Sequence, residues 1–165
     1  MPDTAVGITP LTWPDVVTIT VPYLRAALGA LSSTTYPNAA DATVANRVPD
    51  DRPVPCVRVQ REGGQAGRTH DDARLVIECW HDRDDKAADL ASITRDLLRV
   101  MPGVRDGWTV TRVVEESGPS AIADPESDLP RYVFVVGVTG SAQPRRDAHQ
   151  QQFAPQRGGP EVIKE

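Results

Sequence analysis

The 165-residue chain has only two cysteines and no long apolar run. Two cysteines cannot build the disulfide framework of a small secreted domain, and no stretch approaches the roughly 20 apolar residues of a membrane-spanning helix. The first ten residues also lack the basic and apolar parts of a secretory signal. We therefore expect a protein of a bacterial cytoplasm, or of a particle assembled there, with no membrane partner.

Positive charge is scarce as well. Lysine and arginine number 18 against 23 acidic residues, which gives a formal net charge of -5. Binding to nucleic acid through a basic surface requires clustered lysine and arginine that neutralise phosphates. The composition therefore argues against a general nucleic-acid-binding protein.

The sequence also lacks the common catalytic and binding motifs. It has no P-loop, no G-x-G-x-x-G after a predicted strand, no G-x-S-x-G, no C-x-x-C and no H-E-x-x-H. His70 and His81 lie at opposite ends of one predicted strand, about 35 Å apart at about 3.3 Å per residue, so they cannot share a metal ion within one subunit. We expect no enzyme activity, assign no catalytic or metal-binding residue, and expect no cofactor.

The chain length fits one domain. We predict an α+β domain over residues 1–140, followed by a polar, extended C-terminal arm over residues 141–165. The arm is rich in glutamine, proline and glycine and has few apolar residues, a composition typical of disordered segments.

Two helices are expected. The first begins either near Thr20, with Pro22 in its first turn, or at Asp15 with a kink at the proline. The β-branched run over residues 16–21 favours the shorter form. The second helix covers residues 84–100, with Asp84 as its N-cap and Pro102-Gly103 ending it.

Period-two patterns predict the strands, with a mobile glycine-rich loop over residues 61–69 and a turn-rich insert over residues 117–130. The order of elements predicts a mostly antiparallel sheet of about five strands with the two helices on one face. The last two strands are apolar on both faces, so the other face is a candidate for a partner. The predicted strands are 43–48, 55–61, 73–81, 108–115 and 131–139.

The second and third of these strands form a predicted long β-hairpin. If its centre lies near Ala66-Gly67, Cys56 lies opposite Cys79. This pair is a redox switch, a metal pair, or two small buried apolar residues. A reducing compartment favours the last interpretation.

Short patterns along residues 11–140 resemble those of one protein family. They are Tyr23–Leu28, Arg47–Pro49 with Arg52-Pro53, Val57–Val59, Gly63-Gly64, Ala73–Trp80, a helix from Asp84, Gly118-Pro119, Asp124-Pro125 and Pro130–Tyr132. In their order and spacing these patterns resemble the tail terminator, or tail completion, proteins of long-tailed bacteriophages, of the actinobacteriophage type.

The resemblance implies a structural virion protein at the tail–neck junction, assembled in the host bacterial cytoplasm. Such proteins form a homohexameric ring that caps the tail tube, stops its polymerisation and joins the tail to the head–neck complex. The implied partners are further copies of the chain, the tail tube protein and a head–neck stopper or completion protein. DNA is only passing cargo, which suits an acidic body that repels phosphate.

Eight residues are the candidates for ring or tail-tube contacts. They are Arg47, Arg52, Arg58, Arg61, Gly63, Gly64, Gly67 and Arg131. For each arginine the alternative is a solvated strand edge. Arg131 is further expected to fix the loop before its strand, against Asp124 or Asp128.

Three other functions remain open. The first is a head-completion or stopper protein of the neck. The second is a small cytoplasmic enzyme that uses Cys79, His81 and Asp82 at the start of the second helix. The third is an adaptor domain that binds a peptide along an exposed strand edge.

Overall fold

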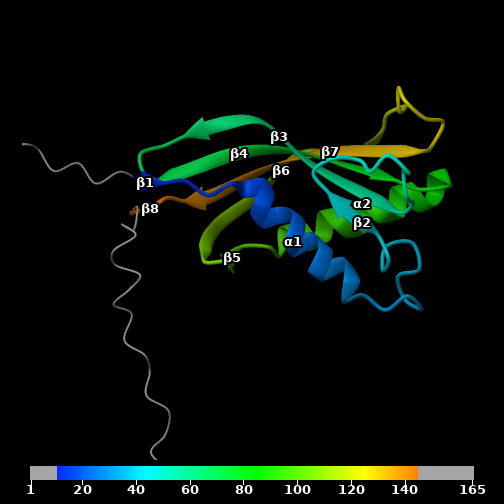
Figure 1. Cartoon of the computed structure of the whole chain (residues 1–165), viewed down its shortest axis with the longest axis horizontal. Helices are drawn as coiled ribbons and strands as arrows, with labels where there is room; N and C mark the ends of the chain where they lie inside the picture. Colours follow the sequence, from blue (N-terminus) through cyan, green and yellow to red (C-terminus); the bar gives the residue numbers. More distant parts are fainter. Residues whose placement is uncertain (1–10, 145–165) are drawn as a thin grey trace, which may run out of the picture.

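The structure is a computed structural model that describes residues 11–144, and it confirms the α+β fold class (Figure 1). A six-stranded sheet has the order β2-β3-β4-β7-β6-β5, and β1 pairs with β8 in a small second sheet. All strand pairs are antiparallel except β2–β3, which is parallel. The elements are β1 (Leu11–Thr12), α1 (Val16–Gly29), β2 (Thr43–Ala45), β3 (Cys56–Ala66), β4 (His70–Trp80), α2 (Asp84–Arg99), β5 (Gly103–Arg105), β6 (Trp108–Ala121), β7 (Arg131–Ser141) and β8 (Gln143–Pro144).

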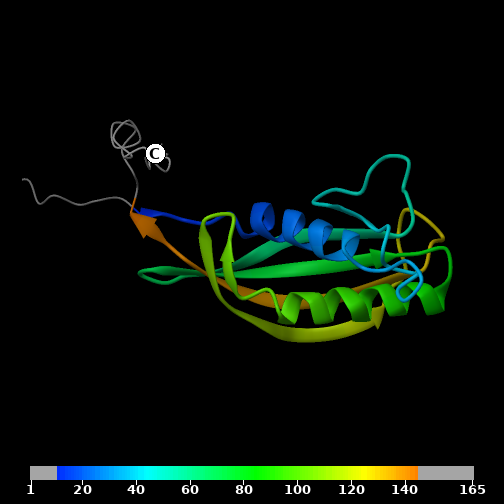
Figure 2. The same cartoon turned by 90° about the horizontal axis from the view of Figure 1, so that it is seen from below.

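The core lies between the two helices and one face of the sheet. Val59, Ile77 and Phe134 lie side by side on β3, β4 and β7, and all three are fully buried. They belong to one cluster with Leu24 of α1 and Leu90 of α2. Both helices therefore cover the same face, as predicted, and within residues 11–144 no helix lies on the opposite face, which we call the helix-free face (Figure 2).

Helix α1 takes the longer of the two expected forms. It begins at Val16, after Asp15, whose carboxylate accepts hydrogen bonds from the backbone N–H of Val17 at 3.0 Å and of Thr18 at 3.4 Å. Pro22 lies inside the helix. The preference for a start near Thr20 was wrong because burial of the first turn against the sheet outweighs the low helix propensity of β-branched residues.

Helix α2 has nearly the expected bounds, but its N-cap prediction was wrong. The N-cap is Arg83, which makes no side-chain capping bond, and Asp84 is the first helical residue. The carboxylate of Asp84 instead accepts a hydrogen bond of 3.2 Å from the hydroxyl of Tyr132 on β7. A side-chain partner on a distant strand thus replaces the local cap.

The β3–β4 hairpin is longer than expected and reaches beyond both helices (Figures 1 and 2). The strands continue to Ala66 and resume at His70, so most of the predicted mobile loop over residues 61–69 belongs to the hairpin. A bulge interrupts the pairing between Arg61 and Gly64. Because the turn lies beyond Ala66, Val57 rather than Cys56 is opposite Cys79, and the predicted cysteine pair was wrong by one residue.

Three further boundaries differ from the sequence prediction. The strand expected over residues 43–48 ends at Ala45, and β5 is an additional edge strand. Strand β6 continues to Ala121, so the first part of the expected insert 117–130 is strand. The predicted arm begins within the sheet region, since Gln143-Pro144 pair with β1, and its remaining residues lie outside the described part of the chain.

Candidate interaction site

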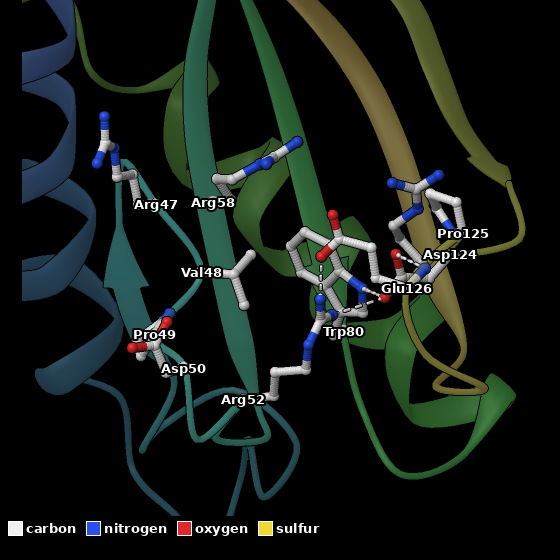
Figure 3. A pocket seen from close by; sticks show the side chains of 11 residues that line it. Arg47, Val48, Pro49, Asp50, Arg52, Arg58, Trp80, Asp124, Pro125 and Glu126 are labelled. Atoms are coloured by element: carbon white, nitrogen blue, oxygen red, sulfur yellow. Dashed lines mark hydrogen bonds and ion pairs between the residues drawn. The ribbon is translucent and has the colours of Figure 1, made fainter.

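A cluster of charged side chains lies at one end of the helix-free face. There the loops over residues 46–55 and 122–130 approach β3, β4 and β7 and border a cleft of about 370 Å³ (Figure 3). Three arginines and three carboxylates join these loops to the sheet. We call this set the arginine clamp: Arg52, Arg58, Arg131, Glu78, Asp124 and Glu126.

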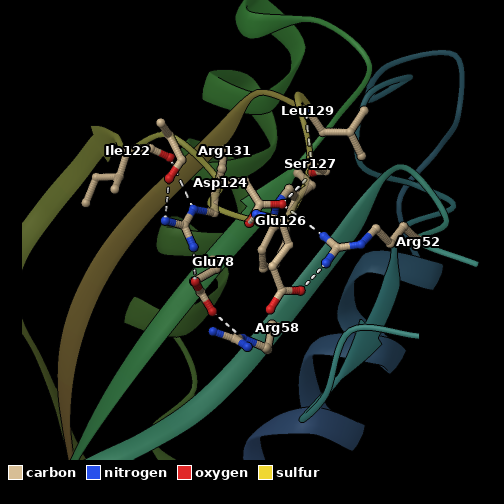
Figure 4. Close-up of polar contacts among 11 residues, drawn as sticks. Arg52, Arg58, Glu78, Ile122, Asp124, Glu126, Ser127, Leu129 and Arg131 are labelled. Carbon is tan, nitrogen blue, oxygen red and sulfur yellow. Dashed lines mark hydrogen bonds and ion pairs between the residues drawn. The ribbon is translucent and has the colours of Figure 1, made fainter. Parts of the chain in front are cut away.

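Glu78 of β4 is the centre of the arginine clamp (Figure 4). One oxygen accepts a hydrogen bond of 2.8 Å from Arg131 Nη1, and the other accepts one from Arg58 Nε. The Glu78 side chain is only 5% exposed. Two guanidinium groups thus offset the cost of removing this side chain from water.

Trp80 lies beside Glu78 on the same strand and is nearly fully buried. The guanidinium carbons of Arg58 and Arg131 lie 5.8 and 5.9 Å from the centre of its ring, within the range of cation–π attraction. Its indole N–H donates a hydrogen bond of 3.2 Å to Asp124 in the loop. The loop is therefore fixed to the sheet through both its charge and this indole.

Asp124 accepts hydrogen bonds from several groups. Its carboxylate accepts hydrogen bonds from Arg52 at 2.9 Å, from Trp80, from the Ser127 hydroxyl and from the backbone N–H of Glu126. Desolvation alone would raise the pKa of this carboxyl, but the hydrogen bonds from Ser127, Glu126 and Trp80, together with the charge of Arg52, hold the pKa below its usual value. The Asp124 carboxylate, which holds the loop to the sheet, is thus charged at neutral pH.

The structure brings four of the candidate arginines to this cleft. Arg52, Arg58 and Arg131 are clamp residues, and Arg47 lines the cleft with an exposed side chain. Arg131 does hold the loop before its strand, by donating to the carbonyl oxygens of Ile122 at 3.1 Å and Ala123 at 2.8 Å. We expected Arg131 to pair with Asp124 or Asp128. This prediction was wrong, because Asp124 forms its ion pair with Arg52.

The other four candidates lie toward the far end of the sheet, in the β3–β4 hairpin. Arg61 makes a two-pronged ion pair with Asp71 of β4, at 2.7 and 2.9 Å. Gly63 and Gly64 form the bulge of β3, and Gly67 opens the turn. The eight candidates therefore form two separate groups, and the group in the β3–β4 hairpin has no part in the arginine clamp.

Sequence reasoning missed Glu78 and Trp80. The only signal was the alternation of Glu78 with apolar residues in a strand, which marks it as a member of one face but does not show that this end of the face is covered. The covering loops come from segments about 25 and 45 residues away, and only the fold brings them there.

Of three comparisons with known proteins, the one with solved structures finds a similar fold. No family model matches the chain, and no curated protein matches it. A chain of the solved structure titled "Virion of native gene transfer agent (GTA) particle" is similar, with a TM-score of 0.52 and 15% sequence identity, over 78% of this chain and 99% of that chain. The two chains share a fold.

The two thiols lie away from both groups of candidates and are buried. Burial raises the pKa of the Cys56 thiol to about 11, and it raises the pKa of Cys79, which lies in the core under α2, still further. The interpretation of two small buried residues is confirmed in this respect. A sealed thiol with a raised pKa is a poor nucleophile, which argues against the enzyme that would use Cys79.

We expect both thiols to resist alkylation by iodoacetamide at pH 8 in the folded protein, because both are buried and burial raises the pKa of each. Both should react fully in 6 M guanidinium chloride, which serves as the positive control. Mass spectrometry of the alkylated chain counts the modified sites. Rapid modification of Cys79 in the folded state would restore the thiol enzyme as a candidate.

The described residues show no metal site and no membrane span. Between residues 11 and 144, no three side chains of His, Cys, Asp or Glu lie close enough together to hold a metal ion. Over the same part of the chain, neither helix is long and apolar enough to cross a membrane.

Proposed function

We propose that this chain is a structural virion protein that caps the tail tube as a hexameric ring, stops its polymerisation and joins the tail to the head–neck complex. The observation that carries the proposal is the shared fold with a virion chain, which extends over 99% of that chain. The order of sequence patterns over residues 11–140, which resembles tail terminators, supports the same class of protein.

The shape of the molecule suits such a role. A closed ring needs two different contact surfaces on each copy, since a patch on one copy meets another patch on the next. The chain offers two distinct ends: the cleft with Arg47 and the arginine clamp, and the β3–β4 hairpin with Arg61, Gly63, Gly64 and Gly67. We propose that these residues contact neighbouring copies, the tail tube protein or the neck protein.

The clamp gives the cleft a defined form before any partner binds. Its three arginines face three carboxylates, so the cluster is neutral and has no excess charge with which to bind a phosphate. Among the described residues, Arg47 is in no ion pair, which leaves its charge available for a partner. A partner that binds at the cleft would therefore contact loops that are already fixed, together with the guanidinium of Arg47.

The test is electron microscopy of a lysate from which this gene product is missing. We expect tubes of uncontrolled length, separate from filled heads, and restoration of normal particles when the intact gene is supplied in trans. Tails of normal length beside unjoined heads would instead assign the protein to the neck, as a completion or stopper protein. Intact infectious particles would contradict both structural roles.

A second candidate, an adaptor that binds an extended peptide, is favoured by one observation. Strand β6 carries a long outer edge, and such edges accept an added strand. This candidate predicts a monomer at every concentration, whereas a ring protein associates with itself. Sedimentation velocity of the purified full chain distinguishes them.

A further inference from the structure

Both outer edges of the six-stranded sheet are covered only in part. At one edge, β2 pairs with just Cys56–Arg58 of β3, which continues to Ala66. At the other edge, β5 pairs with just Trp108–Val110 of β6, which continues to Ala121. Within residues 11–144, the stretches 59–66 of β3 and 111–121 of β6 therefore have a neighbouring strand on one side only.

Such open edges present unpaired backbone N–H and C=O groups, which pair readily with another strand. The side chains along both stretches are mostly exposed. Each edge is longer than the three-residue strand that protects it. Exposed edges of this length are uncommon in a protein that acts alone, because they invite pairing with other chains.

The two protecting strands lie at opposite ends of the sheet. Ala45 of β2 lies level with Arg58 and, across β4 and β7, with Ser120 near the end of β6. Gly103 of β5 lies level with Val110 and, across β7 and β4, with Ala66 at the tip of the hairpin. The open middle parts of the two edges are thus at the same level.

We infer that the open edge of β6 in one copy pairs antiparallel with the open edge of β3 in the next copy, which makes the sheet continuous around the ring. This inference rests on the proposed ring. Three successive antiparallel pairings separate β3 from β6, so the two strands run in opposite directions and continue the antiparallel order.

A small offset between copies moves β2 and β5 outside the stretch in which the two edges pair. If the second copy is displaced by two residues, about 7 Å, toward the C-terminal end of β6, its β2 lies level with the residues that follow Ala121, and Ala66 at the end of its β3 comes level with Val113, beyond the last residue of β6 that pairs with β5. At this offset Gly64 of the β3 bulge comes level with Glu115, where the pairing of β6 is also irregular. The two interruptions then face each other, and on their hairpin side the regular stretches 64–66 of β3 and 113–115 of β6 come into register.

An offset between neighbours is compatible with a closed ring. In β-barrels a regular stagger between strands is accommodated by tilting the strands relative to the barrel axis. Each copy would contribute one β3 edge and one β6 edge, so neither of these two stretches remains unpaired after closure. Closure of this kind also explains why two different edges are left open on the same subunit.

Cysteine cross-linking of the full-length chain tests the proposed pairing of β6 in one copy with β3 in the next. At an offset of two residues, Gln65 of β3 lies opposite Val114 of β6, and both are exposed on the helix-free face. Within one copy the same two positions are three strand spacings apart, about 14 Å, too far for a disulfide. The buried Cys56 and Cys79 do not compete for the reagent.

The variants Gln65→Cys and Val114→Cys are produced separately and together in one cell, then treated with a short bis-maleimide whose reach tolerates an error of about one residue. We expect covalent dimers only in the mixed sample, and a ladder up to the full ring for the double variant. Ser92→Cys, on the exposed side of α2, replaces Val114→Cys in the matched control, which should give no dimer with Gln65→Cys.

Two results would contradict the proposed pairing of β3 and β6 between copies. Dimers from Val114→Cys alone would show that β6 pairs with itself, and the absence of dimers from the mixed sample would show that the two edges do not meet. Either result leaves the tail-length experiment untouched, so failure of this interface and failure of the proposed function are distinguishable. Circular dichroism of each variant confirms that it has folded.

Discussion

Replacement of Glu78 with alanine should lower the free energy of unfolding by about 3–5 kcal/mol, the range for removal of one partner from a buried ion pair. Glu78 is 5% exposed, and its loss leaves Arg131, itself only 13% exposed, and Arg58 without a carboxylate on β4. Two like charges would then face each other across the ring of Trp80. Urea unfolding of the full chain measures the change.

Glu126→Ala is the matched control, since Glu126 also pairs with a clamp arginine but is 73% exposed. Exposed pairs contribute about 0–1 kcal/mol, so this variant should unfold almost like the parent. Glu78→Gln, which keeps the shape and one acceptor, should fall between the two. If Glu78→Ala loses less than about 1 kcal/mol, the clamp is not what holds the loops to the sheet.

Replacement of Gly64 with alanine should lower the free energy of unfolding by about 2–4 kcal/mol, from a strained backbone together with overpacking. The φ angle of Gly64 is +123°, and an added Cβ would lie 2.0 Å from the carbonyl oxygen of Asp72. The backbone fixes the position of the Cβ, and the oxygen that it meets is itself a backbone atom, so no side-chain rotation relieves the conflict. Thermal unfolding and urea unfolding both measure the change.

Gly63→Ala serves as the control one residue away. Its φ angle is +106°, but an added Cβ meets nothing within 4 Å. We expect a loss of about 1–2 kcal/mol from the backbone conformation alone. Equal effects at the two positions would mean that the hairpin moves to accommodate the methyl group and that the close approach of β3 to β4 is not fixed.

The variants Gly64→Ala and Gly63→Ala also distinguish a role in the stability of the subunit from a role in contacts with other subunits or the tail tube. The glycines were chosen from the sequence as candidates for ring or tube contacts, and Gly64 has a sufficient reason inside the subunit to be glycine. The contact role of Gly63 and Gly64 therefore stays a prediction. A Gly63→Ala protein that is folded yet fails to cap tails would support it.

The sequence was sufficient for the features that depend on local pattern. The alternation correctly placed Leu75, Ile77 and Cys79 on one face of β4, because side chains in a strand point alternately to opposite faces; the structure shows that this face meets the helices. The helix over residues 84–99 followed from its apolar stripe and the Pro102-Gly103 stop. These features are set by residues only a few positions apart.

Features that depend on distant residues could not be predicted. Local propensity argued against a helix start before Thr20, yet packing of Val16 and Ile19 against the sheet decided it. The bulge at Gly63 and Gly64 extends the hairpin where their glycine content suggested a loop. Likewise, no local pattern links Arg131 to Glu78, because that pair exists only through the register of β4 and β7.

The pairing of Leu11 with Pro144 has a practical consequence for labelling. Because β1 and β8 are neighbours near the hairpin turn, the chain enters and leaves the domain at one end of the sheet (Figure 1). A fluorescent protein fused directly before Leu11 or directly after Pro144 is therefore attached to this end, opposite the arginine clamp. The two fusions should report the same pole of the subunit in an assembled particle, and either one leaves the cleft unobstructed.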